Sequence, residues 1–179
     1  MRGSQNVIDY NTKHGQVIYS KNTETLPICD LSGDGLAGFL QNTKDRSSEA
    51  RWTTTLMVPC TDGQIRDFFE QHGTITLDEI KDHTALYIGL HTWNAQNSYQ
   101  MAVCFKKTLT DEAKLTVEST PSNYTVNGQV DGVAYLKTII MNSIVDTRFT
   151  TMTIREKLQA LPAHMIALDN NITSFNNDV

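Results

Sequence analysis

The most regular hydrophobic pattern of the chain lies between Asp131 and Leu161. Apolar residues at three- and four-residue steps predict a helix with one apolar face, formed by Val133, Leu136, Ile139, Ile140 and Ile144. Asp131 precedes this run, and we expect it to cap the helix. A second helix is predicted from Thr150 or Thr151 up to Pro162, and its apolar set is Met152, Ile154, Leu158 and Leu161. Two such helices joined by a short polar turn predict an αα-hairpin.

The first part of the chain has no such pattern. Residues 1–29 are polar with scattered apolar residues, of which Val7, Ile8, Val17 and Ile18 are candidates for short strands. An arm that packs against a partner, or a disordered segment, fits these residues equally well. Residues 1–4 match a vector-derived tag, and they are left out of the fold argument.

Between residues 30 and 75 the pattern predicts short elements. An apolar face over Leu36–Lys44 predicts a helix, and a charged linker follows at residues 46–51. Residues 52–58 are rich in Thr, Leu and Val and fit a strand or an extended connection. A turn at residues 61–63 then leads into a predicted helix over Gln64–His72, whose inward side chains are Ile65, Phe68 and Phe69.

Residues 76–130 carry the clearest local signals. Thr76 and Glu79 are spaced as a capping box before an apolar run, which contains Ile80, Leu86, Tyr87, Leu90 and Trp93. This helix is expected to kink or break at residues 94–98. A short helix after Thr110 has Leu115 and Val117 as its apolar pair. The pair Asn127-Gly128 is typical of a two-residue hairpin turn. The sequence thus predicts a mainly α-helical domain with αα-hairpins and a small β-hairpin element.

Composition narrows the class of protein. The chain has 179 residues, enough for one domain or a domain with an arm, and 39% of them are hydrophobic. Its net charge of -5 argues against this chain being the main nucleic-acid-binding region, because binding to phosphates requires clustered Lys and Arg. The lysine group at positions 106, 107 and 114 is small. Three distant cysteines without a CxxC pair predict free thiols, and no apolar run reaches membrane-spanning length. We therefore expect a cytoplasmic protein without a membrane partner.

Residues 30–41 partly match the pattern of a calcium-binding loop. Asp30, Ser32 and Asp34 occupy its first, third and fifth positions, but the twelfth position holds Gln41 instead of Glu. The favoured alternative is that Ser32 or Asp34 caps the following helix.

Residue types suited to catalysis form one loose group in the sequence: Asp78, Glu79, His83, His91 and Cys104. The two histidines are eight residues apart, about two helical turns, which is too far for a shared metal on one helix. The common catalytic motifs are absent from the sequence. We therefore expect no enzyme and no cofactor.

The order of motifs along the chain resembles the Gag-like polyprotein of copia-type LTR retrotransposons. In that family a DGP-x-x-L-K-x-I helix is followed by a DTR-x-T turn, a helix with L-x-x-L and a helix with I-x-x-FN. The matching residues here are Asp131, Gly132, Leu136, Lys137, Ile139, Asp146, Thr147, Arg148, Leu158, Leu161, Ile172, Phe175 and Asn176, while Val133 replaces the proline. DLSGDGLAGFL, far upstream, extends the likeness, which covers most of the chain from about Leu31.

The resemblance implies a structural protein that assembles with itself into particles around element RNA. RNA contact would belong mainly to a basic or zinc-knuckle region outside this chain. Residues 30–179 would form the capsid-like domain, continuing in the natural protein past Val179. Because the last helix is short, its apolar residues Ile172, Phe175 and Val179 are the predicted self-association site. The alternative is a helical module, recruited by a host, that binds one protein or peptide.

Overall fold

The computed structural model describes residues 7–143 and residue 155. The chain divides into two compact units, residues 1–143 and residues 144–179. The described part of the first unit is mainly helical with two small antiparallel hairpins, which confirms the predicted fold class. In the predicted αα-hairpin, the second helix lies outside the described residues, except for Arg155, which is helical and exposed.

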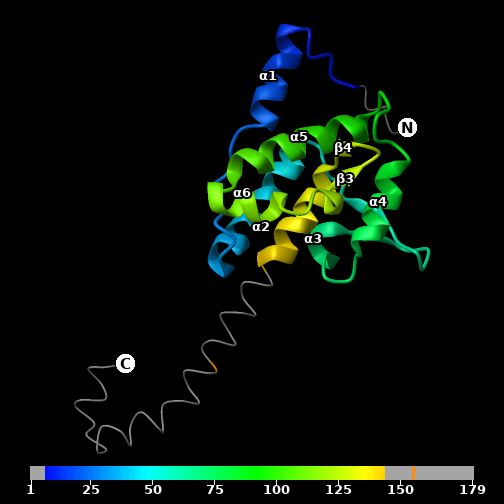
Figure 1. Ribbon diagram of the computed structural model, residues 1–179. Helices are drawn as coiled ribbons and strands as arrows, with labels where there is room; N and C mark the ends of the chain where they lie inside the picture. The colour runs from blue at the N-terminus through cyan, green and yellow to red at the C-terminus, as the bar shows by residue number, and fades with distance from the viewer. Residues whose placement is uncertain (1–6, 144–154, 156–179) are drawn as a thin grey trace, which may run out of the picture. The chain divides into compact units, whose positions relative to one another are not determined.

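The elements follow one another in chain order (Figure 1). The helices are α1 (Lys13–Asn22), α2 (Gly33–Glu49), α3 (Phe68–Gln71), α4 (Leu77–Ala85), α5 (Trp93–Thr108), α6 (Asp111–Glu118), the 3₁₀-helix η1 (Pro121–Asn123) and a helix over residues 132–143. The strands are β1 (Met57–Pro59), β2 (Ile65–Asp67), β3 (Thr125–Val126) and β4 (Gln129–Val130), paired β1 with β2 and β3 with β4.

Local polar residues determine where the helices begin. Helices α1 to α6 each follow a residue whose side-chain oxygen accepts a backbone N–H of the first turn: Thr12, Ser32, Asp67, Thr76, Thr92 and Thr110. Asp131 does the same for the 132–143 helix, where its Oδ2 accepts from the Ala134 N–H at 2.7 Å. Such bonds satisfy donors that have no partner inside the helix. The predicted caps at Thr76 and Asp131 are confirmed.

The core is built around α5 and the 132–143 helix. The predicted face of the latter is buried at Val133, Leu136, Ile139 and Ile140, and Ile144 lies outside the described residues. From α5, Met101, Cys104 and Phe105 are buried against it, and Phe39 of α2, Trp52 and Phe68 complete the same cluster. Gly132 lets the two helices approach closely, since a Cβ there would lie 2.6 Å from the Met101 Cβ.

The two hairpins differ in how well the sequence predicted them. The hairpin of β3 and β4 turns at Asn127 and Gly128, whose φ angles of 49° and 77° fit the predicted two-residue turn. The hairpin of β1 and β2, which turns near Gly63, was not predicted. In its place we expected a helix from Gln64, with Ile65 pointing inward. That expectation is wrong for residues 65–67, because Ile65 lies in β2 and is 65% exposed, but the rest of the predicted helix is present as α3, with Phe68 buried and Phe69 packed against the core.

Several predicted boundaries also change. Val17 and Ile18 lie in helix α1, so the strands expected there are wrong. Helix α2 continues through most of the predicted charged linker and ends at Glu49. The expected break at residues 94–98 is wrong, because these residues lie within helix α5. The helix is interrupted earlier, at residues 86–92, between α4 and α5. That break exposes Leu86 and Leu90, which were expected on an apolar helical face.

Candidate interaction surface

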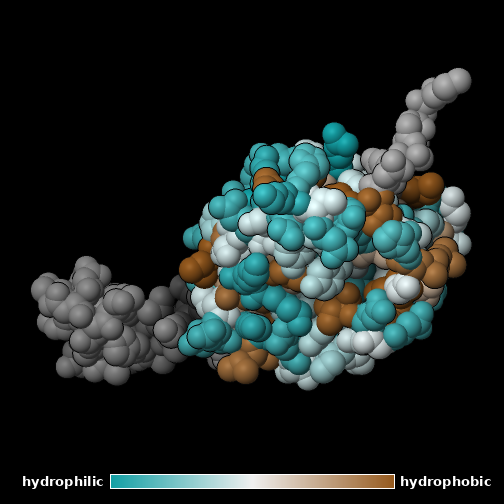
Figure 2. Space-filling view, turned by 90° about the horizontal axis from the view of Figure 1, so that it is seen from above, coloured by the Kyte–Doolittle hydropathy of each residue, from teal (hydrophilic) through white to brown (hydrophobic). Residues whose placement is uncertain are grey.

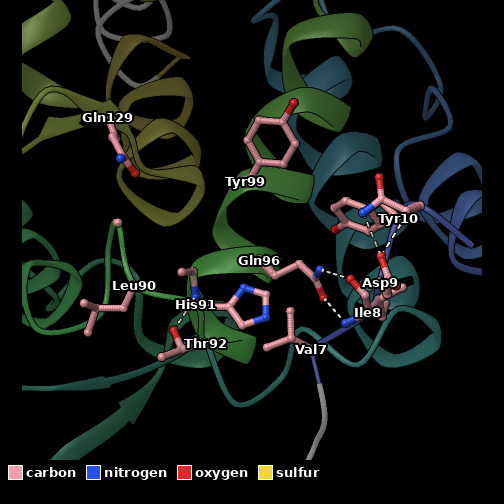
Figure 3. Close-up of a pocket in the computed structure, with 13 residues that line it drawn as sticks. Val7, Ile8, Asp9, Tyr10, Leu90, His91, Thr92, Gln96, Tyr99 and Gln129 are labelled. Carbon is pink, nitrogen blue, oxygen red and sulfur yellow. Dashed lines mark hydrogen bonds between the residues drawn. The ribbon is translucent and has the colours of Figure 1, made fainter.

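An open groove of about 780 Å³ lies where four parts of the first unit meet. Its walls are residues 7–11, the turn before α5, the first turns of α5 and Gln129 of the β3–β4 hairpin (Figure 3). Gly89, with φ of 78°, allows the chain to turn sharply here. Leu90 and Tyr99 line the groove and are more than half exposed, so it presents apolar surface to solvent.

Gln96 holds the N-terminal wall of the groove by its backbone. Its Oε1 accepts from the Ile8 N–H at 2.8 Å, and its Nε2 donates to the Ile8 carbonyl at 2.7 Å (Figure 3). This pair of bonds uses the two groups that every residue except proline carries. Gln96 therefore binds this segment through its backbone, and these two bonds do not depend on the side chain at position 8.

Gln100, one turn further along α5, is a buried hub for polar groups. Its Oε1 accepts from Asn22 Nδ2 at 2.8 Å and from Trp52 Nε1 at 3.2 Å. Its Nε2 donates to the Tyr10 hydroxyl at 2.6 Å. Burial raises the pKa of Tyr10, so this hydroxyl keeps its proton at neutral pH. The Gln100 amide thus forms hydrogen bonds to the N-terminal segment, to the end of α1 and to Trp52 at the same time.

Three tyrosine rings cover the outside of this hub. The Tyr10 and Tyr19 centroids are 4.9 Å apart, and Tyr19 stacks on Tyr99 with centroids 6.3 Å apart and planes at 19°. Rings at such distances contribute favourable contacts beyond their buried area. The cluster joins α1 to α5 at the edge of the groove.

Asp131 is the most deeply buried carboxyl group among the described residues with a resolved pKa shift. Ser98 Oγ donates to its Oδ1 at 2.7 Å, and the Gly132 N–H donates to the same Ser98 oxygen at 2.9 Å. Burial raises the pKa of Asp131, while the hydrogen bonds that it accepts from Ser98 and from the Ala134 N–H oppose that shift. A group enclosed in this way, with its oxygens occupied, serves the helix start and has no access to a substrate.

The loose group of catalytic residue types does not form a site. Glu79 accepts from the Thr76 and Thr61 N–H groups, each at 2.9 Å, and these bonds lower the pKa of Glu79 to about 2. Cys104 is buried, and burial raises the pKa of its thiol to about 11, so it is not a reactive thiolate. Burial also lowers the pKa of His83. His91 instead lines the groove. Within residues 7–143 and 155, no group of three potential metal ligands is found.

The calcium-loop candidates are used as a helix cap. Asp30 Oδ1 accepts from the Ser32 N–H at 3.0 Å and from its hydroxyl at 2.6 Å. Ser32 Oγ then accepts from the Gly35 N–H at 3.1 Å, which starts α2. The bonds from Ser32 lower the pKa of Asp30. The cap interpretation is confirmed for Ser32, while Asp34 lies in the first turn of the helix.

Two of the three lysines that the sequence groups together, Lys106 and Lys107, have partners inside the unit. Lys106 Nζ lies 3.1 Å from Glu118 and less than 6 Å from the ring centroids of Tyr124 and Tyr135. Lys107 Nζ donates to the Thr23 carbonyl at 3.4 Å. A cation engaged in this way is less available to phosphate. None of the helices in the described part of the chain has the length and apolar character needed to cross a bilayer.

Sequence reasoning missed the residues that make this surface. The predicted self-association residues, Ile172, Phe175 and Val179, lie outside the described residues. The structure instead points to Gln96, Gln100 and residues 7–11. A signal was present: two glutamines four residues apart lie on one face of a helix. Their partners are 88 and 90 residues away in sequence, so spacing alone did not reveal them.

Comparisons of the chain with protein-family models, with curated proteins and with solved structures found no match.

Proposed function

We propose that this chain is a capsid-like structural protein that associates with copies of itself, and that it derives from a copia-type Gag. The order of the sequence motifs supports the family. Two matching positions of the first helix, Leu136 and Ile139, are buried, and Asp131 is its cap, which gives the motif a structural reason. Packing of element RNA is part of the proposal and would depend mainly on a region outside this chain.

The order of the sequence motifs carries the proposal, and the exposed apolar side chains of the first unit are the contacts available for self-association. Large apolar residues are at least 58% exposed at separate places on the first unit: Val17, Ile28, Ile65, Leu86, Leu90 and Leu115. Figure 2 shows brown apolar residues as separate spots among polar ones over the face it displays. A single apolar residue is normal on a surface, and each spot is too small for a tight interface. Many weak contacts of this kind suit a symmetric assembly.

The test is sedimentation velocity over a wide range of protein concentration, with electron microscopy of the largest species. We expect a shift from monomer toward dimers and larger species. Phe175→Ser should reduce the shift with little change in melting temperature, since Phe175 belongs to the predicted self-association site. Leu115→Ser, a matched removal of one apolar side chain from α6, reports whether the described surface contributes.

Two results would count against the proposal. A chain that stays monomeric up to millimolar concentration has no self-assembly. If Phe175→Ser unfolds the protein, that residue belongs to a core, and the assembly surface is elsewhere. In that case the Leu115→Ser result decides whether the exposed apolar residues of the first unit form the assembly surface.

A second function, a peptide-binding module without catalytic activity, is favoured by one contact. Gln96 already binds both backbone groups of Ile8, and apolar surface from Leu90 and Tyr99 lies beside it. Extended peptides bind to proteins through such main-chain bonds combined with side-chain contacts. A strictly monomeric chain that captures an extended peptide in this groove would support this function over self-assembly.

A further inference from the structure

We propose that residues 7–23 form an exchangeable arm, which docks on α5 of its own copy or on α5 of a second copy. The inference deepens the proposed self-assembly and rests on it, because exchange requires two copies to meet. It commits to one occupant for the surface made by Gln96, Tyr99 and Gln100: the same arm from another molecule.

The arm contributes almost nothing to the hydrophobic core. Within residues 7–23 the buried residues are Gly15, Asn22 and Thr23, none of which is a large apolar side chain, and the core cluster of the described residues begins at Leu26. Val17, in the middle of α1, is 67% exposed. Segments with few buried apolar contacts open at a lower free energy than the whole domain. The arm can therefore leave its site without unfolding the rest of the unit.

Much of the arm's hydrogen bonding stays within the arm. The Asn11 N–H donates to Asp9 Oδ1 at 2.9 Å, and the Thr12 hydroxyl donates to the Asp9 carbonyl at 2.8 Å. Thr12 Oγ1 in turn accepts from the Gly15 N–H at 3.0 Å and caps α1. These local bonds form equally well in either copy, so exchange between copies replaces each contact with an identical one.

The docking surface matches this arm at several separate points. Gln96 takes both backbone groups of Ile8, and Gln100 takes the Tyr10 hydroxyl and the Asn22 amide. Arg46 Nη1 donates to the Lys21 carbonyl at 2.8 Å, at the C-terminal end of α1, where a cation is favourable. When the arm is docked, the Gln100 amide is buried and bonds to Tyr10 and Asn22, and when the arm leaves, water must replace these two partners. The segment that meets all these partners is this arm itself.

The connector between arm and core is short and exposed. Glu24 and Thr25 are exposed, whereas Leu26 is buried and its N–H donates to Thr108 Oγ1 at 3.2 Å. The Cys29 N–H donates to the Thr108 carbonyl at 2.9 Å, which anchors the chain beyond the connector. Figure 1 shows α1 at the outer edge of the unit, joined to it by this connector. Residues 24–25 are thus the place where the chain would turn toward a second copy.

The first measurement is hydrogen exchange, followed by mass spectrometry, on the full chain. The α1 amides should exchange faster than those of the 132–143 helix, through an opening of their own. Gln96→Ala removes two hydrogen bonds to Ile8 and should speed α1 exchange roughly tenfold, with no effect on the 132–143 helix. Gln41→Ala is the matched control, because Gln41 lies exposed on α2 and bonds only to Asp45 nearby; it should leave α1 exchange unchanged.

The second measurement is photocrosslinking between two full-length copies of different mass. A photoreactive benzoylphenylalanine replaces Tyr19 in one copy, which keeps an aromatic ring against Tyr99. The second copy carries a mass tag and no photoreactive group. We expect label from position 19 in the tagged copy, within the peptide that contains residues 96–100, and more of it at higher concentration. The same group at Asp78, an exposed polar residue of α4 outside the proposed contacts, measures random collisions.

Each outcome decides the proposal. If α1 exchanges only together with the 132–143 helix, the arm does not detach, and the proposal is overturned. If α1 opens separately but position 19 labels the tagged copy no more often than position 78, the arm does not exchange, and the proposal is also overturned. Oligomers without this label would leave self-assembly standing without arm exchange. A chain that stays monomeric and carries only intramolecular label would remove both proposals.

Discussion

The substitution Gly132→Ala tests whether the 132–143 helix packs on α5 at the distance seen here. A Cβ at position 132 would overlap the carbonyl oxygen of Ser98, lie 2.6 Å from the Met101 Cβ and lie 3.0 Å from the Ala102 nitrogen. These atoms belong to the α5 backbone or are directly attached to it. Side-chain rotation therefore cannot relieve the overlap, and one helix must move.

The expected cost follows from two opposing effects. Forcing an extra methyl group into a packed interface typically costs about 1–3 kcal/mol, and contacts with backbone place this case toward the upper end. Alanine favours a helix by up to ~1 kcal/mol over glycine. This gain is smaller at position 132, which is the first helical residue. We expect a net loss of about 2 kcal/mol in the free energy of unfolding, which corresponds to a fall of roughly 4–8 °C in melting temperature.

The matched control is the same substitution in open space. Gly38→Ala lies inside α2, and a Cβ there has no atom within 4 Å. It should stabilise the protein by about 0.5–1 kcal/mol, because glycine loses more backbone freedom on folding. Urea unfolding followed by circular dichroism measures both variants. If Gly132→Ala is as stable as the parent while Gly38→Ala behaves as expected, the close approach of the two helices is wrong.

Four further predictions test the fold and the proposed partners. Ile140→Asp buries a charge on the predicted face and should cost several kcal/mol, enough to unfold a marginal domain; a melting temperature within a degree or two of the parent would refute the assignment of that face. The pKa of Glu79 is about 2 when folded, below its ordinary 4.5, so its carboxylate stabilises the fold above that ordinary value, and this contribution is lost as pH falls from 4.5 toward 2. Glu79→Gln should flatten the pH dependence of stability in this window, and an unchanged slope would show that the capping box does not bind the carboxylate. Calcium or a chelator should leave the melting temperature unchanged, because Asp30 supports the α2 cap and we expect no calcium to bind there. A ligand that binds only the native state must raise the melting temperature, so a rise of several degrees with calcium would overturn this role of Asp30. RNA binding by this chain should be weak and disappear at moderate salt in a filter-binding assay. Tight binding at physiological salt would show that the protein has an RNA-binding groove or a base-stacking surface, and would contradict this prediction.

Local chemistry explains what the sequence alone determined. Thr76 with Glu79 and Asp131 were recognisable as helix starts, and Asn127-Gly128 as a hairpin turn, because each depends on bonds within four residues or on φ angles that particular residues favour. The apolar face of the 132–143 helix followed from its spacing. These features gave the mainly helical class. The family, the last helix and its self-association residues remain predictions.

Only the tertiary structure decided which apolar residues are inside and where the chain recognises its own N-terminal segment. On α6 the sequence paired Leu115 with Val117, yet Leu115 is 75% exposed, and the shorter Ala113 is buried. That choice depends on which neighbour a helix meets, and periodicity does not contain this information. The bonds from Gln96 and Gln100 to the N-terminal segment join residues about 90 positions apart. A glutamine side chain can hydrogen-bond either to water or to a buried partner, and the sequence does not distinguish these two cases. Its role therefore depends on whether the fold brings a partner next to it.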